Sequence, residues 1–232
     1  MPCERIIADQ NIWFYKSDIL GFMSKNNYII GIDEVGRGPI AGPVTVGIVG
    51  IDMKSPAAKS LGLLVKHKID GIRDSKQLTP REREHIYAEM VQYKKDGKIE
   101  FYTTSVNASI VDEKGMTHAV SNAIARLLRK FDVDETEVKI VLDGRLYAPE
   151  KFVNQKTVVK GDTIHLSIAL ASIAAKVVRD KYMMKQDKVF PEYGFKKHKG
   201  YGTVEHRKAL QKYGLSPLHR KTYCKGVKKL RK

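Results

Sequence analysis

The acidic pair Asp33-Glu34 is the first place in the chain where residue types and spacing indicate chemistry. An apolar, β-branched run over 28–32 leads directly into these two carboxylates. Four glycines and two prolines lie between 31 and 43, and such residues end regular structure and let a ligand approach the backbone closely. An acidic pair alone is more typical of a solvated turn. Its interpretation therefore depends on what other segments supply.

Two further carboxylates are predicted to lie where they could join this pair. Asp143 follows the short apolar strand 139–142, and Asp180 shares one side of a predicted helix with Ser172 and Lys176, at intervals of four residues. Clustered carboxylates repel each other and repel phosphate, so they need a compensating cation. Oxygen ligands without His or Cys at ligand spacing favour Mg²⁺ or Mn²⁺. Two such ions could hold the attacking water and the leaving oxygen of a phosphodiester displacement.

Each of these acids also has a simpler interpretation. Asp143 can belong to an Asp-Gly turn after a strand, and Asp180 can belong to a solvated helix face between two basic residues. Asp162 and Asp74 are rival acids. We interpret Asp162 as the cap of the helix that follows it and Asp74 as an organiser of its loop.

A second group of residues could contact a polyanion. The backbone amides of Gly36-Arg37-Gly38 could reach a sugar hydroxyl or a phosphate, although a simple turn would have the same sequence. Ser172 and Lys176 could offer a hydroxyl and an ammonium group to a phosphate. Tyr201 has a glycine on each side, which predicts a ring presented on a turn where it could stack on a nucleotide. The nearby histidines, for which phosphate contact and surface exposure are equally open, are His198, His206 and His219.

Composition narrows the class of protein. The chain has 232 residues, of which 42% are hydrophobic, enough for a buried core. Its 42 Lys and Arg against 26 Asp and Glu give a net charge of +16, which favours a polyanionic partner. Thirteen of these basic residues lie from Gly194 onward, with one acid. Cys3 and Cys224 match no metal or disulfide pattern, and no apolar run approaches the roughly 18 residues of a membrane span, so we expect a cytoplasmic protein.

The helices and strands that must position these residues are predicted from hydrophobic periodicity and from the Gly, Pro and capping residues at their ends. Predicted strands cover 28–32, 43–51, 98–106, 139–142 and a segment beginning at 157. Predicted helices cover about 79–95, 115–131, 163–186 and 204–213, and Thr79-Pro80-Arg81-Glu82 is a capping box. Residues 52–73 are predicted to be a less regular connection. We expect one α/β domain in three parts: a helical extension over 1–27, a catalytic core over 28–190 and a basic helical region over 191–232.

Four segments resemble a known family. They are Gly31 to Pro39 with Gly42-Pro43, Asp74 to Thr79, Ala171 to Asp180, and His198 to Thr203 with Ser216 to Arg220. In residues and order they closely resemble ribonuclease HII, the type 2 ribonuclease H family, over residues 28 to 223. Type 3 relatives lack the Gly-Arg-Gly and carry a different fourth acid, so the type 2 family is favoured.

The resemblance implies a ribonuclease H-like α/β fold, in which a mixed five-stranded sheet is flanked by helices and additional C-terminal helices grip a duplex. It implies an acidic site for two Mg²⁺ or Mn²⁺ ions in the catalytic complex. The metal ligands would be Asp33, Glu34, Asp143 and Asp180. Gly36-Arg37-Gly38 and Tyr201 would sense the ribose 2′-hydroxyl and stack on the neighbouring deoxyribose.

The resemblance also implies an activity. Family members cut RNA paired with DNA and incise 5′ to a ribonucleotide embedded in duplex DNA, leaving 3′-hydroxyl and 5′-phosphate ends. The alternatives are a non-catalytic nucleic-acid-binding protein on a nuclease-like scaffold, and a DNA-only nuclease or strand-transfer enzyme. We expect a monomer. The tail over 225–232 shows no sliding-clamp docking motif.

Overall fold

The computed structural model of the protein describes residues 28–69 and 78–226. The helical extension predicted for 1–27, the Asp74-Ser75-Lys76 segment and the last six residues of the basic tail lie outside the described residues. Among the helices within the described ranges, none is both long and apolar enough to cross a membrane.

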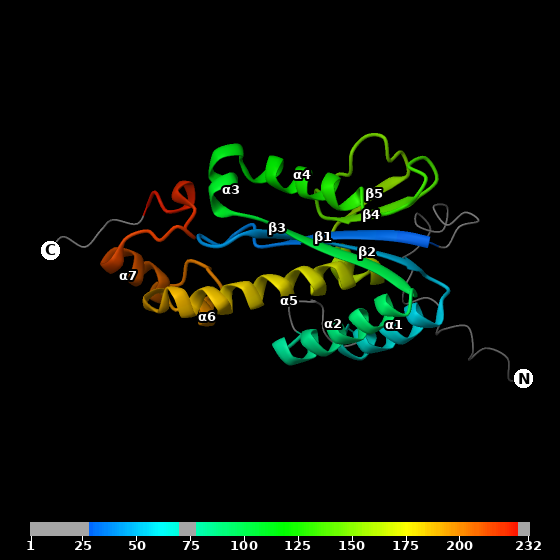
Figure 1. Ribbon diagram of the computed structural model, residues 1–232, viewed down its shortest axis with the longest axis horizontal. Helices are drawn as coiled ribbons and strands as arrows, with labels where there is room; N and C mark the ends of the chain where they lie inside the picture. Colours follow the sequence, from blue (N-terminus) through cyan, green and yellow to red (C-terminus); the bar gives the residue numbers. More distant parts are fainter. Residues whose placement is uncertain (1–27, 70–77, 227–232) are drawn as a thin grey trace, which may run out of the picture. The chain divides into compact units, whose positions relative to one another are not determined.

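Five strands form one mixed sheet in the order β3-β2-β1-β4-β5, which confirms the predicted five-stranded sheet (Figure 1). Strand β1 pairs in parallel with β4, and β4 pairs in parallel with β5. The strands are β1 (Tyr28–Val35), β2 (Val44–Asp52), β3 (Ile99–Val106), β4 (Lys139–Asp143) and β5 (Gln155–Val158). Strand β1 continues past the predicted end at 32, so the acidic pair lies within the strand and not in the loop after it.

The predicted helices after residue 78 are present, and several begin where the sequence indicates. Thr79 caps α2 in a capping box with Glu82, and α7 covers the predicted segment. The helices are α1 (Pro56–Ile69), α2 (Pro80–Lys95), α3 (Ala108–Lys114), α4 (Met116–Leu128), α5 (Leu166–Val189), α6 (Phe195–His198) and α7 (Val204–Tyr213). Short 3-10 turns are η3 (Gly161–Thr163), η4 (Pro191–Tyr193) and η5 (Lys221–Tyr223).

The prediction of an irregular connection over 52–73 is wrong, because helix α1 occupies most of it. The Ser55 hydroxyl accepts a hydrogen bond from the backbone N–H of Ala58 at 3.1 Å, as a helix cap does, and Pro56 is the first helical residue. Ala57, Ala58 and Leu61 are buried. The Ser-Pro pair was the local signal for this helix.

Asp162 does not cap helix α5, so that prediction is also wrong. It lies in η3, and α5 begins at Leu166. The backbone N–H of His165 donates to the carbonyl of Gly161 at 2.8 Å, which inserts a tight turn before the helix starts.

The described residues form two compact units. Unit 1 takes the residues up to Asp33, Ile48–Phe101 and Val133–Ala171; unit 2 takes Glu34–Gly47, Tyr102–Asp132 and the residues from Ser172 onward. Helices α1 and α2 lie side by side in unit 1 (Figure 1), and α3 contacts α4 in unit 2. A buried cluster of unit 1 comprises Ile29, Val141, Val158 and Ile168. A buried cluster of unit 2 comprises Ile40, Ala41, Met183, Tyr193, Phe195, Leu210 and Cys224.

Strand β1 and the first turn of α5 approach so closely in unit 1 that only glycine fits at position 31. A Cβ atom built on Gly31 would lie 2.3 Å from the backbone carbon of Ser167. We expect Gly31→Ala to lower the free energy of unfolding by about 1–3 kcal/mol or more, because strand and helix must separate. Urea unfolding measures this. Gly38→Ala is the control for stability, since the nearest atom to its added Cβ lies at 4.0 Å; equal stability of the two variants would contradict the close-packing argument.

Candidate metal and substrate site

The parallel pairing of β1 and β4 brings two of the predicted acids to the same edge of unit 1. Ile32 pairs with Leu142 in register, so Asp33 and Asp143 are the next residues of two neighbouring parallel strands. Residues in register on neighbouring strands point to the same face of a sheet. Asp33 is 5% exposed and Asp143 is half-buried. Two partly desolvated carboxylates thus lie together at the carboxyl ends of these strands.

The surroundings of Asp143 disfavour its negative charge. Burial, followed by the charge of Asp162, raises the pKa of the Asp143 carboxyl above its usual value. Hydrogen bonds from the backbone N–H groups of Gly161, Asp162 and Gly144 act in the opposite direction, and the Gly161 nitrogen lies 2.6 Å from Asp143 Oδ1. A bound cation at this edge would favour the ionised carboxylate.

The other two predicted acids belong to unit 2, and each lies beside a basic side chain. Arg37 donates from Nη1 to Oε1 of Glu34 at 3.2 Å, and the Glu34 side chain is largely buried. On α5 the Lys176 ammonium lies 2.7 Å from Asp180 Oδ1, which confirms that residues four apart share one side of the helix. Ser172, one turn earlier, is half-buried.

The glycine loop after β1 is held by a buried arginine that the sequence analysis did not identify as functional. Arg220 is fully buried and donates to the carbonyl oxygens of Gly36 at 2.6 Å, Arg37 at 2.8 Å and Gly42 at 2.9 Å. Because Arg220 lies in a run of basic residues, its sequence context is typical of a solvated charge.

Arg179 is a second buried arginine that contacts the same loop. Its guanidinium donates to the carbonyls of Pro43 at 2.9 Å and Ala41 at 3.2 Å. Gly36 has a φ of +101°, and a Cβ there would lie 2.4 Å from Arg179 Nε, so this position needs glycine. Burial lowers the pKa of Arg179 to about 10, which leaves it charged at neutral pH. The interpretation of 179–181 as a solvated face is therefore wrong for Arg179.

The grip of Arg220 fixes which way the loop backbone points. In a trans peptide, the carbonyl of one residue and the N–H of the next point in opposite directions. Since the carbonyls of Gly36 and Arg37 face the Arg220 guanidinium, the N–H groups of Arg37 and Gly38 face away from it. Arg37 and Gly38 are exposed. The loop therefore presents two backbone donors on its outer side.

Tyr201 lies beside these donors in unit 2. The residue is 45% exposed, as predicted for a turn position, and a Cβ placed on Gly38 would be 4.0 Å from Tyr201 Cε1. The carbonyl of Gly200 accepts hydrogen bonds from the N–H groups of Ile40 at 2.9 Å and Ala41 at 3.2 Å. The Tyr201 turn and the glycine loop are thus joined through main-chain hydrogen bonds.

The prediction of surface exposure is wrong for two of the three histidines in the basic region. His206 and His219 are buried, and their Nε2 atoms lie 2.9 Å apart. His198 is half-buried and stacks on His206 with ring centroids 4.2 Å apart. Their hydrogen-bond partners lie within unit 2, whereas Tyr201 in the same region is exposed.

The carboxylates of Asp33 and Asp143 fit a hard divalent cation by chemistry, because both supply oxygen donors at one strand edge. Over residues 28–69 and 78–226, no group of three or more His, Cys, Asp or Glu side chains is arranged so that it could hold a metal ion. Within unit 1, the structure therefore places Asp33 beside Asp143.

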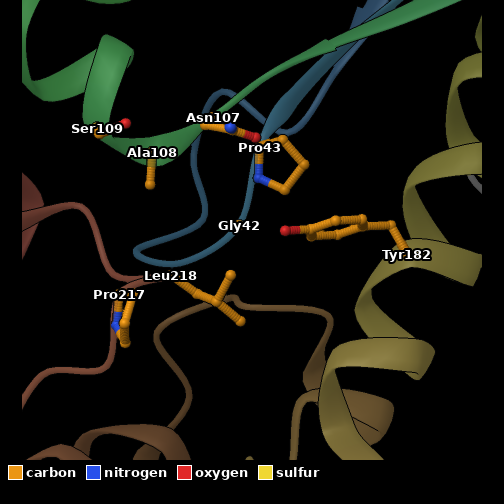
Figure 2. A pocket seen from close by; sticks show the side chains of 8 residues that line it. All are labelled: Gly42, Pro43, Asn107, Ala108, Ser109, Tyr182, Pro217 and Leu218. Carbon is orange, nitrogen blue, oxygen red and sulfur yellow. The ribbon is translucent and has the colours of Figure 1, made fainter. Parts of the chain in front are cut away.

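Unit 2 also contains a pocket of ≈ 160 Å³ next to the glycine loop (Figure 2). The Tyr182 hydroxyl points toward Gly42 across it, and Asn107 lies next to Pro43. The residues that line it are Gly42, Pro43, Asn107, Ala108, Ser109, Tyr182, Pro217 and Leu218. Sequence analysis identified neither Asn107 nor Tyr182, since single polar residues next to apolar ones carry no local signal.

The sequence of this chain is similar to those of known proteins over most of its length. The family model described as Ribonuclease HII matches residues 30–226. The ribonuclease HII of Caldicellulosiruptor bescii is 35% identical over 223 residues, which cover 96% of this chain and 98% of that protein. The ribonuclease HII of Clostridioides difficile is 38% identical over 200 residues, which cover 86% of this chain and 71% of that protein.

Solved structures have the same fold. The ribonuclease H2 of Pyrococcus horikoshii OT3 has a TM-score of 0.66 at 25% identity, covering 84% of this chain and 93% of that one. A ribonuclease HII of Archaeoglobus fulgidus, solved in complex with PCNA, has a TM-score of 0.65 at 21% identity, covering 84% and 92%. A Bst ribonuclease HIII solved with Mn²⁺ has a TM-score of 0.61 at 19% identity, covering 85% and 67%.

Proposed function

Because the chain belongs to the ribonuclease HII family, it is a metal-dependent endoribonuclease that cleaves RNA in RNA–DNA hybrids and at ribonucleotides embedded in DNA, and we propose which residues carry this reaction. The proposed metal ligands are Asp33, Glu34, Asp143 and Asp180. The in-register placement of Asp33 beside Asp143 at the carboxyl ends of β1 and β4 is the observation that supports this pair, and the family motifs that contain Glu34 and Asp180 support the other two.

The carboxylates are proposed to hold Mg²⁺ or Mn²⁺, two ions in the catalytic complex. Bound there, such ions supply a nucleophilic water and stabilise the charge on the leaving oxygen. The protein's part is to orient the carboxylates. Asp143 is held by the Gly161 N–H, and Glu34 by Arg37. Lys176 balances the charge of Asp180, and with Ser172 it is proposed to contact a substrate phosphate.

Recognition of the ribonucleotide is proposed to use the glycine loop and Tyr201. The outward N–H groups of Arg37 and Gly38 can donate to a ribose 2′-hydroxyl, the group that distinguishes RNA from DNA. The exposed ring of Tyr201 beside Gly38 can then stack on the neighbouring deoxyribose. Incision 5′ to the ribonucleotide would leave 3′-hydroxyl and 5′-phosphate ends.

The direct test is incision of a labelled DNA duplex that contains one ribonucleotide, with Mg²⁺ or Mn²⁺ added. An RNA–DNA hybrid and an all-DNA duplex of the same sequence are run in parallel. We expect cleavage of the first two substrates and none of the third. Binding without turnover would indicate a non-catalytic protein. Cleavage of all three substrates would indicate a nuclease that does not read the 2′-hydroxyl.

Tyr201→Ala is expected to slow cleavage at an isolated ribonucleotide by about fivefold to a hundredfold, because stacking on an aromatic ring is worth roughly 1–3 kcal/mol. The fold should remain intact, since the ring is 45% exposed. Single-turnover rates at saturating enzyme measure the effect. Tyr147→Ala, which removes a 66% exposed ring from unit 1, is the matched control. Equal rates for the Tyr201 variant and wild type would remove the stacking role.

We further propose that 28–190 form the catalytic core, that 191–232 grip the duplex through their positive charge, and that the protein acts as a cytoplasmic monomer. The region from Gly194 onward holds 13 Lys and Arg residues. Light scattering of the purified protein tests the oligomeric state.

A further inference from the structure

A chain of hydrogen bonds runs through two buried histidines to the main chain of Tyr201. It starts at Ser216, whose backbone N–H lies 2.9 Å from His219 Nδ1. His219 Nε2 lies 2.9 Å from His206 Nε2. His206 Nδ1 then lies 2.8 Å from the carbonyl oxygen of Tyr201. All these residues belong to unit 2.

The two ends of this chain fix the proton positions on both rings. A backbone N–H can only donate, so Nδ1 of His219 carries no proton and its Nε2 does. That N–H donates to Nε2 of His206, whose single proton must then be on Nδ1. A carbonyl can only accept, and the Tyr201 carbonyl accepts this proton. Both rings are therefore neutral, and each bond of the chain has one donor and one acceptor.

The backbone groups around His198, on the turn that precedes Tyr201, fix the proton position on its ring in the same way. Its Nδ1 accepts from the N–H of Gly200 at 3.2 Å, and its Nε2 donates to the carbonyl of Tyr193 at 2.8 Å. Its own carbonyl accepts the N–H of Tyr201 at 2.9 Å. The main chain of Tyr201 is thus held at its N–H by His198 and at its carbonyl by His206.

The series of hydrogen bonds is also connected to the glycine loop, through His219 and the residue after it. The backbone of His219 forms an antiparallel bridge with Ala41, and the next residue, Arg220, grips the carbonyls of Gly36 and Arg37. One short segment therefore positions both proposed readers of the ribonucleotide: the loop through Arg220 and Tyr201 through the histidines.

We propose that His206 and His219 are positioning residues that, in their neutral forms, hold the main chain of Tyr201 so that its ring meets the nucleotide beside Gly38. This inference rests on the proposed function, because it takes the role of Tyr201 from there. Neither histidine touches the substrate.

A proton added to either ring would disrupt the chain. On His219 Nδ1 it would face the Ser216 N–H, and the Ser216 hydroxyl, 2.8 Å from the same nitrogen, would have to change from donor to acceptor; on His206 Nε2 it would face the N–H of His219. Burial lowers the pKa of both rings to about 4; for His206 the hydrogen bond to the Tyr201 carbonyl acts in the opposite direction, and the charge of Arg207 on α7 acts in the same direction as burial. Unfolded histidines take up a proton near pH 6.5, so the folded state loses stability as pH falls from about 6.5 to about 4.

Nuclear magnetic resonance of the ¹⁵N-labelled protein tests the proton positions without any activity measurement. Long-range ¹H–¹⁵N spectra at pH 7.5 should show a proton on Nδ1 of His206 and on Nε2 of His219, with both rings neutral down to about pH 5. Signals are assigned with His206→Gln and His219→Gln. A proton on Nε2 of His206, or a charged ring at pH 7.5, would overturn the proposal.

A double-mutant cycle tests the functional link. His219→Leu leaves His206 Nε2 without its donor and should slow cleavage at a single ribonucleotide about tenfold or more, as expected for supporting residues. In the Tyr201→Ala background it should add little. His219→Gln, whose amide can replace the Nε2 donor, should recover part of the rate.

Equal slowing by His219→Leu in both backgrounds would show a general structural role and overturn the proposal. His118→Leu, at an exposed position on α4, should leave the rate unchanged. If wild type itself does not cleave, the proposed function fails, and the proton positions then decide whether the histidine chain exists.

Discussion

Asp33→Asn is expected to reduce incision at an embedded ribonucleotide by about a hundredfold to a thousandfold or more, since a metal's stabilisation of the transition state is worth several kcal/mol. Asparagine keeps the size of the side chain and one carbonyl oxygen but removes the negative charge. Asp33 is 5% exposed and lies in register beside Asp143, so the substitution removes a charge from a largely desolvated position. Single-turnover cleavage with saturating Mg²⁺ measures the effect.

The matched control is Asp52→Asn, because Asp52 also belongs to unit 1 but is exposed at the end of β2, where its carboxylate accepts the N–H of Lys54. Its rate should equal that of wild type. Binding of the ribonucleotide-containing duplex by Asp33→Asn should persist, since losing a negative charge lowers repulsion of phosphate. A cleavage rate close to wild type for Asp33→Asn would refute its assignment as a ligand.

Local signals in the sequence predicted the parts of the fold that depend on local interactions. The capping box at Thr79 needs only Glu82 three residues later, and the structure contains both of its hydrogen bonds. The apolar, β-branched runs before Asp33 and Asp143 predicted two strands, and their parallel pairing places the two acids together. Where a local signal was present but overlooked, as in the Ser55-Pro56 start of α1, the helix was missed.

The parts that could not be predicted depend on partners far away in the chain. Arg179 and Arg220 bond to carbonyls 136 to 184 residues earlier, and the nearby sequence makes both look like solvated basic residues. His206 is likewise buried in contact with His219, which lies thirteen residues later on a separate segment. Backbone carbonyls have no sequence signature, so side chains that bind them are found only once the fold is known.

Arg220→Lys is the variant that most directly tests whether the loop must be held from inside. The guanidinium serves the carbonyls of Gly36, Arg37 and Gly42 at once, and a single ammonium on a flexible stem cannot reproduce this fork. Each buried carbonyl left without a donor costs about 1–3 kcal/mol. We expect a loss of about 2–4 kcal/mol in the free energy of unfolding, measured in urea.

The same variant should separate recognition from affinity. If Arg220 turns the N–H groups of Arg37 and Gly38 outward, Arg220→Lys should slow cleavage at a ribonucleotide by at least about tenfold, since one lost oriented donor is worth more than 1.4 kcal/mol. Affinity for an all-DNA duplex should change little, because the positive charge remains.

Arg207→Lys is the control, because Arg207 is exposed and donates to the Gly202 carbonyl at 2.9 Å. Its free energy of unfolding should lie within about 0.5 kcal/mol of that of wild type. If Arg220→Lys equals wild type in cleavage rate and stability, the loop keeps its conformation without the guanidinium. Arg220 would then not be what turns the N–H groups of Arg37 and Gly38 outward.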